Sequence, residues 1–339
     1  MMSGMGAAAT VEVTTCLYCD GARLEPLFDR VVDRLGFVPG SWAFRKCADC
    51  GSAILSPKPP DETLAALYPP VYTFSPEVRD AGGVSRMLAS AEYSLFFRPQ
   101  YRTQVKTVLR ALGGSASGLR LLDIGCGRGY RLPLLQAEGF AVEATDFEPA
   151  VVDYVAHRFG VRAVATDVAG LTEHFDREGF DVVTAFYVLE HVPDIHAAIN
   201  AYCALLKPGG LLVAAVPFVD GLQPRLLGRH WSNTAEAPRH LSIPSHAGLR
   251  RACETAGLVD CRFYPDSALQ SAANVALSVL PGGATTAAYG SGRVGALLLR
   301  ALGAGVTLAS VPASLVHSRI TSTPSFGMIV ARRPLPGPT

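Results

Sequence analysis

Two pairs of cysteines near the N-terminus have the spacing of a metal site. Cys16 and Cys19 form one C-x-x-C pair, and Cys47 and Cys50 form a second pair, which Gly51 follows. Four thiolates in two such pairs suit a tetrahedral Zn²⁺ ion, and a glycine after the pair permits a tight turn. A shell of four sulfurs is closed, which predicts a structural site and not a catalytic one. A redox pair is the alternative, although nothing nearby resembles a thioredoxin unit.

A glycine-rich turn is the second feature that could form a functional site. The segment LLDIGCGRGY places three glycines directly after an apolar run and before a helical segment. Glycines at such a turn let a ligand approach backbone N–H groups closely. The dinucleotide pattern G-x-G-x-x-G is not matched, because the third glycine comes too early. Asp123, two positions before Gly125, suits a cationic ligand better than a pyrophosphate.

Acidic residues end the two predicted strands that follow this turn. Asp146 ends the first of them, where a carboxylate can accept both hydroxyls of a ribose. Asp167 ends the next, at the same edge of the sheet, where it can receive an adenine amino group. A helix N-cap or a solvated loop is the alternative role for each. Their order after the glycine turn predicts a site for a nucleoside.

Two histidines are candidates for a general base. His191 ends the segment FYVLEH after the fourth predicted strand and has a reference pKa near ~6.5. His240 lies in HWSNTAEAPRHL after the fifth strand, where it can orient or deprotonate an acceptor. In the same loop, Trp231 can stack on a ring. The alternatives are a structural histidine for His191 and loop packing for the second segment.

Short apolar segments alternate with amphipathic ones from residue 119 onward. This alternation predicts an α/β fold with a doubly wound parallel sheet. The expected strands are LRLLDIG, FAVEATD, VRAVATD, FDVVTAFYV and GLLVAAVP, with CRFYPDS and SFGMIVARR near the C-terminus. The expected helices cover residues 131–138, 150–159 and 195–206. The polar side chains named above therefore follow strands, at the edge where parallel sheets bind ligands.

A hydrophobic stretch separates the last two predicted strands. Residues 267–292 and 301–318 contain no Asp, Glu, Lys or Arg, but Pro281-Gly282-Gly283 interrupts the first segment and Pro312 the second. They are weak candidates for membrane-spanning helices, which need ~20 predominantly apolar residues. We expect buried helices or an oligomer interface, with contact to a membrane surface or a lid over the substrate as alternatives.

Composition limits the class of protein. The 339 residues are 49% hydrophobic and 17% charged, and the formal net charge is +1. Extensive disorder is therefore excluded, and binding to a nucleic-acid backbone, which needs a basic excess, is not expected. The N-terminus has neither a basic n-region nor an apolar h-region. We therefore expect a cytoplasmic protein. The hydrophobic stretch could also associate it with a membrane.

Taken in order, the motifs LLDIGCGRGY, ATDFEP, ATDV, FDVVTAFYVLEHVPD and LKPGGLLVAAVP resemble the class I S-adenosylmethionine-dependent methyltransferase family. The resemblance implies a Rossmann-like, seven-stranded sheet in which SFGMIVARR is the one antiparallel strand. It places Gly125 and Gly127 under the methionine part of the cofactor. The full set of expected cofactor contacts is Asp123, Gly125, Cys126, Gly127, Gly129, Asp146, Phe147, Asp167, Val168 and Tyr187. The candidate catalytic residues are His191, His240 and Tyr187.

The acceptor is expected to be a small molecule, a sugar or a lipid-linked glycan. An N-terminal cysteine ribbon joined to this domain resembles bacterial enzymes that modify sugars or natural products, most of all by O-methylation. Sugar C-methylation is one alternative. An RNA methyltransferase is another, although the acidic and basic residues between Cys16 and Cys50 cancel. Some quinone-pathway O-methyltransferases hold a metal at this point, but Tyr187 replaces the glutamate that would join Glu190 and His191, so no metal is predicted there.

The expected organisation has five parts. They are a zinc-ribbon-like domain (1–75), a helical linker or lid (76–117), the methyltransferase domain (118–266), a hydrophobic helical insertion (267–319) and the last strand with its tail (320–339). The insertion is also the segment expected to form a homodimer or to contact a membrane.

Overall fold

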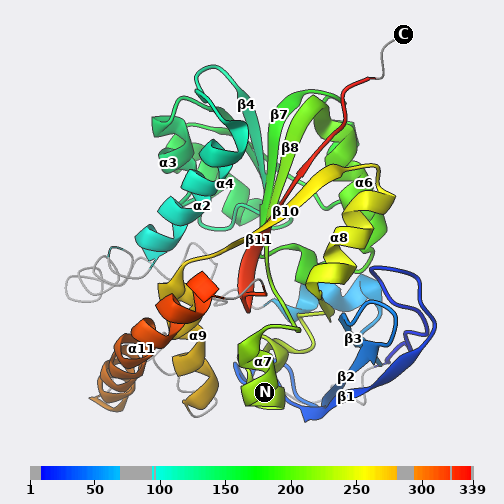
Figure 1. Cartoon of the computed structure of the whole chain (residues 1–339), viewed down its shortest axis with the longest axis vertical. Coiled ribbons are helices and arrows are strands. Elements are labelled where there is room, and N and C mark those ends of the chain that lie inside the picture. The colour runs from blue at the N-terminus through cyan, green and yellow to red at the C-terminus, as the bar shows by residue number, and fades with distance from the viewer. Residues whose placement is uncertain (1–8, 69–93, 95–96, 281–293, 321–322, 337–339) are drawn as a thin grey trace.

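The chain folds into one large and one small β-sheet, which the computed structural model shows in contact (Figure 1). The structure describes residues 9–68, 94, 97–280, 294–320 and 323–336. Within these residues, no helix combines the length and the apolar character needed to cross a membrane.

The large sheet has seven strands in the order β10-β11-β8-β7-β4-β5-β6. Strand β11 runs antiparallel to both of its neighbours, and the pairs among β4 to β8 are parallel. This confirms the expected α/β fold with a central, mostly parallel sheet. The strands are β4 (Arg120–Ile124), β5 (Ala141–Asp146), β6 (Arg162–Ala165), β7 (Phe180–Phe186), β8 (Leu206–Pro217), β10 (Val259–Pro265) and β11 (Phe326–Arg332).

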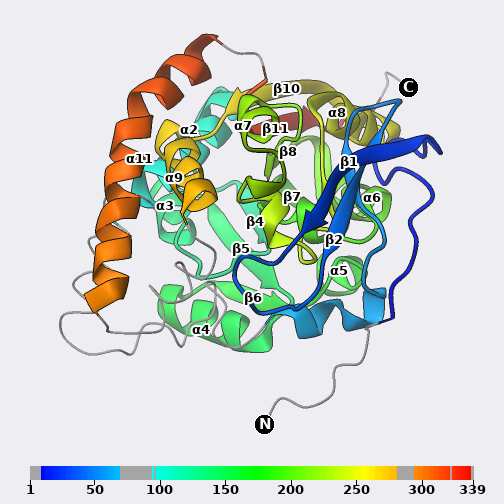
Figure 2. The same ribbon diagram turned by 90° about the horizontal axis from the view of Figure 1, so that it is seen from below.

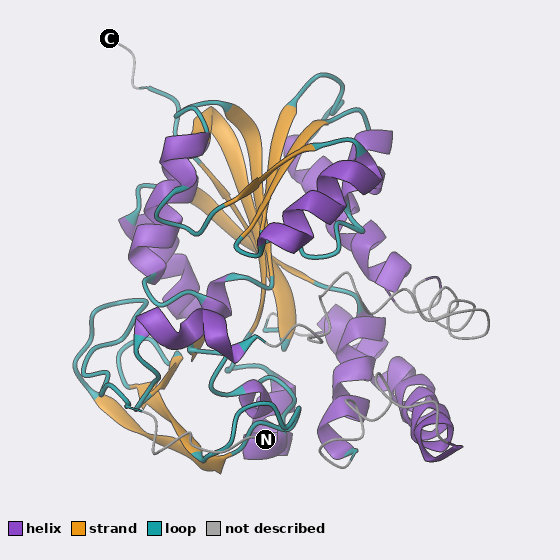
Figure 3. Cartoon of the chain, turned by 180° about the vertical axis from the view of Figure 1, so that it is seen from behind, coloured by secondary structure: helices purple, strands orange, loops and turns teal. Residues whose placement is uncertain are grey.

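Helices cover both faces of this sheet (Figure 3). Apolar residues of α2, α3 and α4 pack on one face, and those of α5, α6 and α8 pack on the other. Serine and aspartate side chains cap several helices, as when Asp194 accepts a hydrogen bond from the N–H of Ala197 at 2.9 Å. The bounds are α2 (Arg98–Leu112), α3 (Leu132–Ala137), α4 (Pro149–Phe159), α5 (Leu171–His174), α6 (Ile195–Leu205) and α8 (His246–Thr255).

The small sheet contains the N-terminal strands and one strand from much later in the chain. Strands β1 (Leu24–Val31), β2 (Trp42–Cys47) and β3 (Ala53–Leu55) pair with β9 (Ser242–Ile243), all antiparallel. Because β3 is fully buried, its backbone groups need a partner on both sides, and β9 supplies it. The N-terminal region, which the sequence suggested as a unit ending near residue 75, is therefore completed by a loop that follows β8.

Short helices connect these parts around the carboxyl ends of the parallel strands. They are η1 (Asp61–Leu67), η4 (Leu189–His191), α7 (Leu222–Leu227), η5 (Gly228–His230) and η6 (Thr234–Glu236). Helices α9 (Ala268–Val279) and α11 (Val294–Ile320) follow β10 and form a pair beside this end of the molecule (Figure 2). The candidate site residues lie between this pair and the small sheet.

Candidate functional site

The glycine turn follows β4 directly and has a backbone that only glycine fits at two positions. Gly125 and Gly129 have φ values of +65° and +66°. A Cβ atom on Gly125 would lie 2.5 Å from Val188 Cγ2, and one on Gly129 would lie 2.8 Å from Phe159 Cε2. A side chain at either position would therefore be strained and would also collide with its neighbours. The turn is held in a shape that exposes backbone rather than side chains.

Asp146 connects this turn to the end of β5. Its Oδ2 accepts a hydrogen bond from the N–H of Gly127 at 2.9 Å, and its Oδ1 accepts one from Glu148 at 3.2 Å. The residue is only 8% exposed, and burial raises the pKa of its carboxyl group. A carboxylate offers about four lone-pair positions, so acceptor capacity for a ligand hydroxyl remains.

Asp123 and Cys126 lie beneath the turn rather than on its surface. The Asp123 carboxylate is fully buried and accepts a hydrogen bond from Thr184 Oγ1 at 2.7 Å, while Arg131 Nε lies 3.7 Å from it. Burial raises the pKa of this carboxyl group. Cys126 is 4% exposed and packs in the core beside α3 and α4. Both side chains therefore support the turn from below.

The residues expected near adenine lie at the same edge of the large sheet as Asp146. The Phe147 ring is exposed and lies 5.3 Å from the ring of Tyr68, measured between centroids. Asp167 is exposed, and its Oδ1 accepts a hydrogen bond from the N–H of Gly170 at 3.0 Å. Val168 is half-buried against the core. These three side chains sit in the loops after β5 and β6, on the same edge as Asp146.

Tyr187 follows β7 in a left-handed conformation, with φ of +60°. Such a backbone is uncommon for a residue with a side chain and is typical of functional positions. Its hydroxyl donates a hydrogen bond to Asp266 Oδ2 at 2.5 Å, and Gln104 Nε2 donates to the same oxygen at 2.9 Å. Burial, followed by the Asp266 charge, raises the pKa of the Tyr187 hydroxyl. Asp266 and Gln104 were not predicted, because nothing in their local sequence marks them.

The structure brings His191 and His240, which are distant in sequence, to one place. Their ring centroids are 4.7 Å apart, and Glu190 offers a carboxylate oxygen within 4.8 Å of a nitrogen of each ring. His191 Nδ1 lies 2.9 Å from Tyr68 Oη and 3.1 Å from the carbonyl oxygen of Arg239. Burial lowers the pKa of each histidine to about 3, so both rings are neutral at pH 7.

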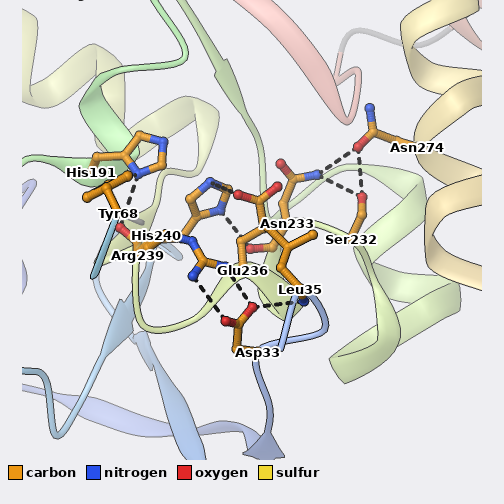
Figure 4. A network of polar contacts seen from close by, with 10 residues as sticks. All are labelled: Asp33, Leu35, Tyr68, His191, Ser232, Asn233, Glu236, Arg239, His240 and Asn274. Carbon is orange, nitrogen blue, oxygen red and sulfur yellow. Dashed lines mark hydrogen bonds and ion pairs between the residues drawn. The ribbon is translucent and has the colours of Figure 1, made fainter. Parts of the chain in front are cut away.

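The hydrogen-bond partner of His240 fixes its tautomer. Nδ1 lies 2.7 Å from the carbonyl oxygen of Asn233, which can only accept, so Nδ1 carries the proton. Nε2 then has a free lone pair, 3.6 Å from Glu236 Oε2. Figure 4 shows His240 and Glu236 in the loop that links β8 to β9. This arrangement allows Nε2 to take up a proton and Glu236 to stabilise the resulting cation.

Glu190 lies beside this pair of histidines. It is 1% exposed, and among the residues that the structure describes its Oε2 has no hydrogen-bond partner. Burial raises the pKa of its carboxyl group to about 8. A neutral acid therefore lies beside two neutral imidazoles at pH 7. The Tyr187 hydroxyl donates its hydrogen bond to Asp266.

A buried ion pair anchors the loop that carries His240. Asp33, in the turn after β1, accepts two hydrogen bonds from the Arg239 guanidinium, at 2.6 and 3.0 Å, and both side chains are fully buried (Figure 4). Asp33 also accepts hydrogen bonds from the N–H groups of Leu35, Phe37 and Val38. This pair was missed in the sequence because its partners are 206 residues apart.

Trp231 is not available to stack on a substrate, contrary to one expectation. It is fully buried, and its Nε1 donates a hydrogen bond to Gln223 Oε1 at 3.1 Å. Its ring packs 5.7 Å from that of Phe326, so it belongs to the core between the two sheets.

The four N-terminal cysteines form one cluster. Sγ of Cys16 lies 3.5 Å from Sγ of Cys50, and Sγ of Cys19 lies 3.6 Å from Sγ of Cys47. All four sulfurs lie within 4.8 Å of one another, and every cysteine of the chain is a free thiol. Tetrahedral Zn–S bonds of about 2.3 Å would place sulfurs roughly 3.8 Å apart. The donor set and its spacing therefore fit a zinc ion.

Comparison with known proteins identifies the domain that carries this site. Residues 97–261 match the family model described as a methyltransferase domain. The chain is similar to the ubiquinone biosynthesis O-methyltransferase of Bradyrhizobium sp. (strain ORS 278), with 34% identity over 125 residues that cover 36% of this chain and 45% of the relative. The protein of the same name from Rhodopseudomonas palustris (strain HaA2) is 36% identical over 128 residues, which cover 36% of this chain and 45% of the relative.

The chain thus spans less than half the length of the curated relatives it matches. Among solved structures, it is similar to a putative sarcosine dimethylglycine methyltransferase from Galdieria sulphuraria. The TM-score is 0.47 and the identity 13%, over 80% of this chain and 96% of the other. The sequence matches support a methyltransferase that uses S-adenosylmethionine. They give no support to a sugar or a lipid-linked glycan as acceptor, so that part of the expectation stays a prediction.

Proposed function

We propose that this chain transfers a methyl group from S-adenosyl-L-methionine to a hydroxyl oxygen of a small molecule. The observation that carries the proposal is the hydrogen bond between Gly127 and Asp146, which joins the glycine turn to the acid after the next strand. The match of residues 97–261 to a methyltransferase domain supports it. The names of the similar proteins favour oxygen as the methylated atom.

The same residues suit the parts of the cofactor. The N–H groups and open backbone of the turn at Gly125–Gly129 would hold its methionine part, and Asp146 would accept hydrogen bonds from the ribose hydroxyls. Phe147, Asp167 and Val168 would border the adenine. When bound, the cofactor supplies a methyl group that is already activated by a sulfonium. The protein then has mainly to align the acceptor and exclude water.

Removing the proton of the acceptor is the remaining chemical task. His191 is half-buried and His240 is buried behind it, so we assign His191 the contact with the hydroxyl and His240 the position beside it. If His191 donates Nδ1–H to the Arg239 carbonyl, its Nε2 is free to accept the proton. The Glu190 carboxyl group lies beside the imidazole that would take the proton. Tyr187, fixed by Asp266, would border the acceptor and the methyl group.

A structural zinc ion is the second part of the proposal. Cys16, Cys19, Cys47 and Cys50 would bind it as thiolates, and four sulfurs leave no open position for catalysis. Tyr18, between the first two cysteines, is fully buried and its hydroxyl lies 2.9 Å from Ser242 Oγ in β9. The metal would therefore stabilise the sheet that carries the end of the His240 loop.

Calorimetry with S-adenosyl-L-methionine tests the proposal. We expect the unmodified chain to bind the ligand and Asp146→Ala to weaken binding by about tenfold or more, because a charged hydrogen-bond acceptor is lost. Glu148→Ala removes an exposed carboxylate two residues away and should leave affinity unchanged. Equal affinity for all three proteins would show that Asp146 does not hold the ribose.

A further inference from the structure

Arg131 is a nearly buried arginine that follows the glycine turn. It is the last residue before α3, two positions after Gly129, and its side chain is 10% exposed. Its Cζ atom lies 4.6 Å from the ring centroid of Phe186, the last residue of β7, and 5.4 Å from that of Tyr101 on α2. A guanidinium packs favourably on aromatic rings, which restricts the side chain. Arg131 is therefore held at the edge of the sheet where β4 and β7 end.

The acid beside Arg131 is too far from it for a hydrogen bond. Arg131 Nε lies 3.7 Å from Asp123 Oδ2. Both atoms are buried, and neither has a hydrogen-bond partner among the residues that the structure describes. Buried polar groups are nearly always paired, so this guanidinium is a candidate for binding a ligand. A guanidinium presents its N–H donors in a planar fork, which matches the two oxygens of a carboxylate.

A second guanidinium belongs to the turn itself. Arg128 lies between Gly127 and Gly129. Its Nε and Nη2 atoms are buried and have no hydrogen-bond partner in the part of the chain that the structure describes. Asp123 is the acid beside Arg131, so Arg128 adds a positive charge that this acid does not balance. The segment from Gly127 to Arg131 therefore has N–H donors and positive charge for an anionic ligand group.

The position of Arg131 indicates which anion this is. Phe186, on which Arg131 packs, directly precedes Tyr187, which the proposed function places beside the methyl group. Burial raises the pKa of the Cys126 thiol, and the charges of Asp123 and Arg131 also act on it, so Arg131 lies beside the turn. The methionine part of S-adenosyl-L-methionine, which the proposed function places against this turn, carries an α-carboxylate. That carboxylate would therefore lie beside Arg131.

We propose that Arg131 binds the α-carboxylate of the methionine part of the cofactor, and that Arg128 attracts the same group at longer range. This inference rests on the proposed function and adds to it the residues that select the ligand by its amino-acid end. Two N–H groups of the Arg131 guanidinium would donate to the two carboxylate oxygens. Asp123, which is fully buried, would hold Arg131 in place by its charge without touching the ligand.

Calorimetry of the full chain with two ligands that differ by a single group tests this proposal. Decarboxylated S-adenosyl-L-methionine keeps the nucleoside, the sulfonium and the amine but lacks the α-carboxylate. The unmodified chain should bind S-adenosyl-L-methionine about tenfold or more tightly than the decarboxylated form, because hydrogen bonds between charged groups are lost. In Arg131→Gln this preference should fall below about threefold, through weaker binding of the carboxylate-bearing ligand alone. Arg110→Gln, which changes an exposed arginine in the last turn of α2, should keep the full preference.

Two further variants make each result decisive. Arg131→Lys keeps a positive charge beside Asp123 but cannot make the two-pronged contact, so it should keep the thermal unfolding midpoint and lose part of the preference. It decides the question if Arg131→Gln does not fold. Arg128→Gln should reduce the preference less than Arg131→Gln does, and a larger effect would overturn the assignment of the contact to Arg131.

The outcomes also separate this inference from the proposed function. If the unmodified chain binds both ligands with equal affinity, or if the Arg131 variants weaken both ligands equally, then the carboxylate is not bound at Arg131 and the inference is overturned. Binding of neither ligand to the unmodified chain would refute the proposed function itself, and this inference with it.

Discussion

Burial shifts the pKa of Glu190 in one direction and the pKa values of His191 and His240 in the other. Burial raises the pKa of the Glu190 carboxyl group to about 8 and lowers that of each imidazole to about 3, so all three are neutral at pH 7. Burial disfavours the charged form of each group, so the resting site holds no buried charge on these three side chains. A general base acts best with a pKa near the working pH, so an imidazole with a pKa of about 3 is a weak base in the resting protein.

Glu190 should make stability fall as pH rises between 6.5 and 8. Its pKa is raised in the folded protein, so the folded chain keeps a proton that the unfolded chain has already lost above about 4.5. The histidines do not interfere, because their stabilisation is lost only when pH falls below about 6.5. The free energy of unfolding should therefore decrease by up to about 1.4 kcal/mol per pH unit in this window.

Chemical denaturation of Glu190→Gln at several pH values measures this contribution. The variant should lose most of the slope, whereas Glu148→Gln, which changes an exposed carboxylate, should keep it. If Glu190→Gln and the unmodified protein show the same slope, then the carboxyl group is ionised in the folded protein and cannot have the role assigned to it.

At the scale of elements, one loop connects the cysteine cluster, the small sheet and the histidines. It runs from the end of β8 to β9, carries Arg239 and His240, and ends as a strand paired with β3. The ion pair of Arg239 with Asp33 fixes the loop from the side of the small sheet. Removing one partner of such a buried pair typically costs about 3–5 kcal/mol, because the other charge stays buried. The position of His240 therefore depends on the N-terminal region.

Zinc binding by that region is open to direct measurement. Elemental analysis of the purified chain should give about one zinc per molecule, and Cys47→Ser should abolish it and lower the unfolding midpoint. Cys203→Ser removes a half-buried thiol outside the cluster and should change neither quantity. Full zinc content in Cys47→Ser would remove that cysteine from the ligand set.

For the whole molecule, the alternation of apolar and amphipathic segments was sufficient to predict the α/β fold and the strands that place the glycine turn and Asp146. These features depend on residues close together in sequence. The contacts missed were distant ones: β9 with β3, Asp33 with Arg239, and Tyr187 with Asp266. Trp231 was misjudged because an aromatic residue in a loop looks the same in sequence whether it is buried or exposed. Which side chains of α9 and α11 are buried also required the structure, since both segments are nearly free of charged residues in sequence.

The central claim is that the edge formed by the glycine turn and Asp146 binds a nucleoside that carries a sulfonium. The most direct measurement is a crystal structure of the chain grown with S-adenosyl-L-homocysteine, the product form of that nucleoside. The account predicts its ribose hydroxyls on the Asp146 carboxylate and its amino-acid part against Gly125 and Gly127. Clear density for the ligand at another place, or an empty edge at saturating concentration, would contradict it.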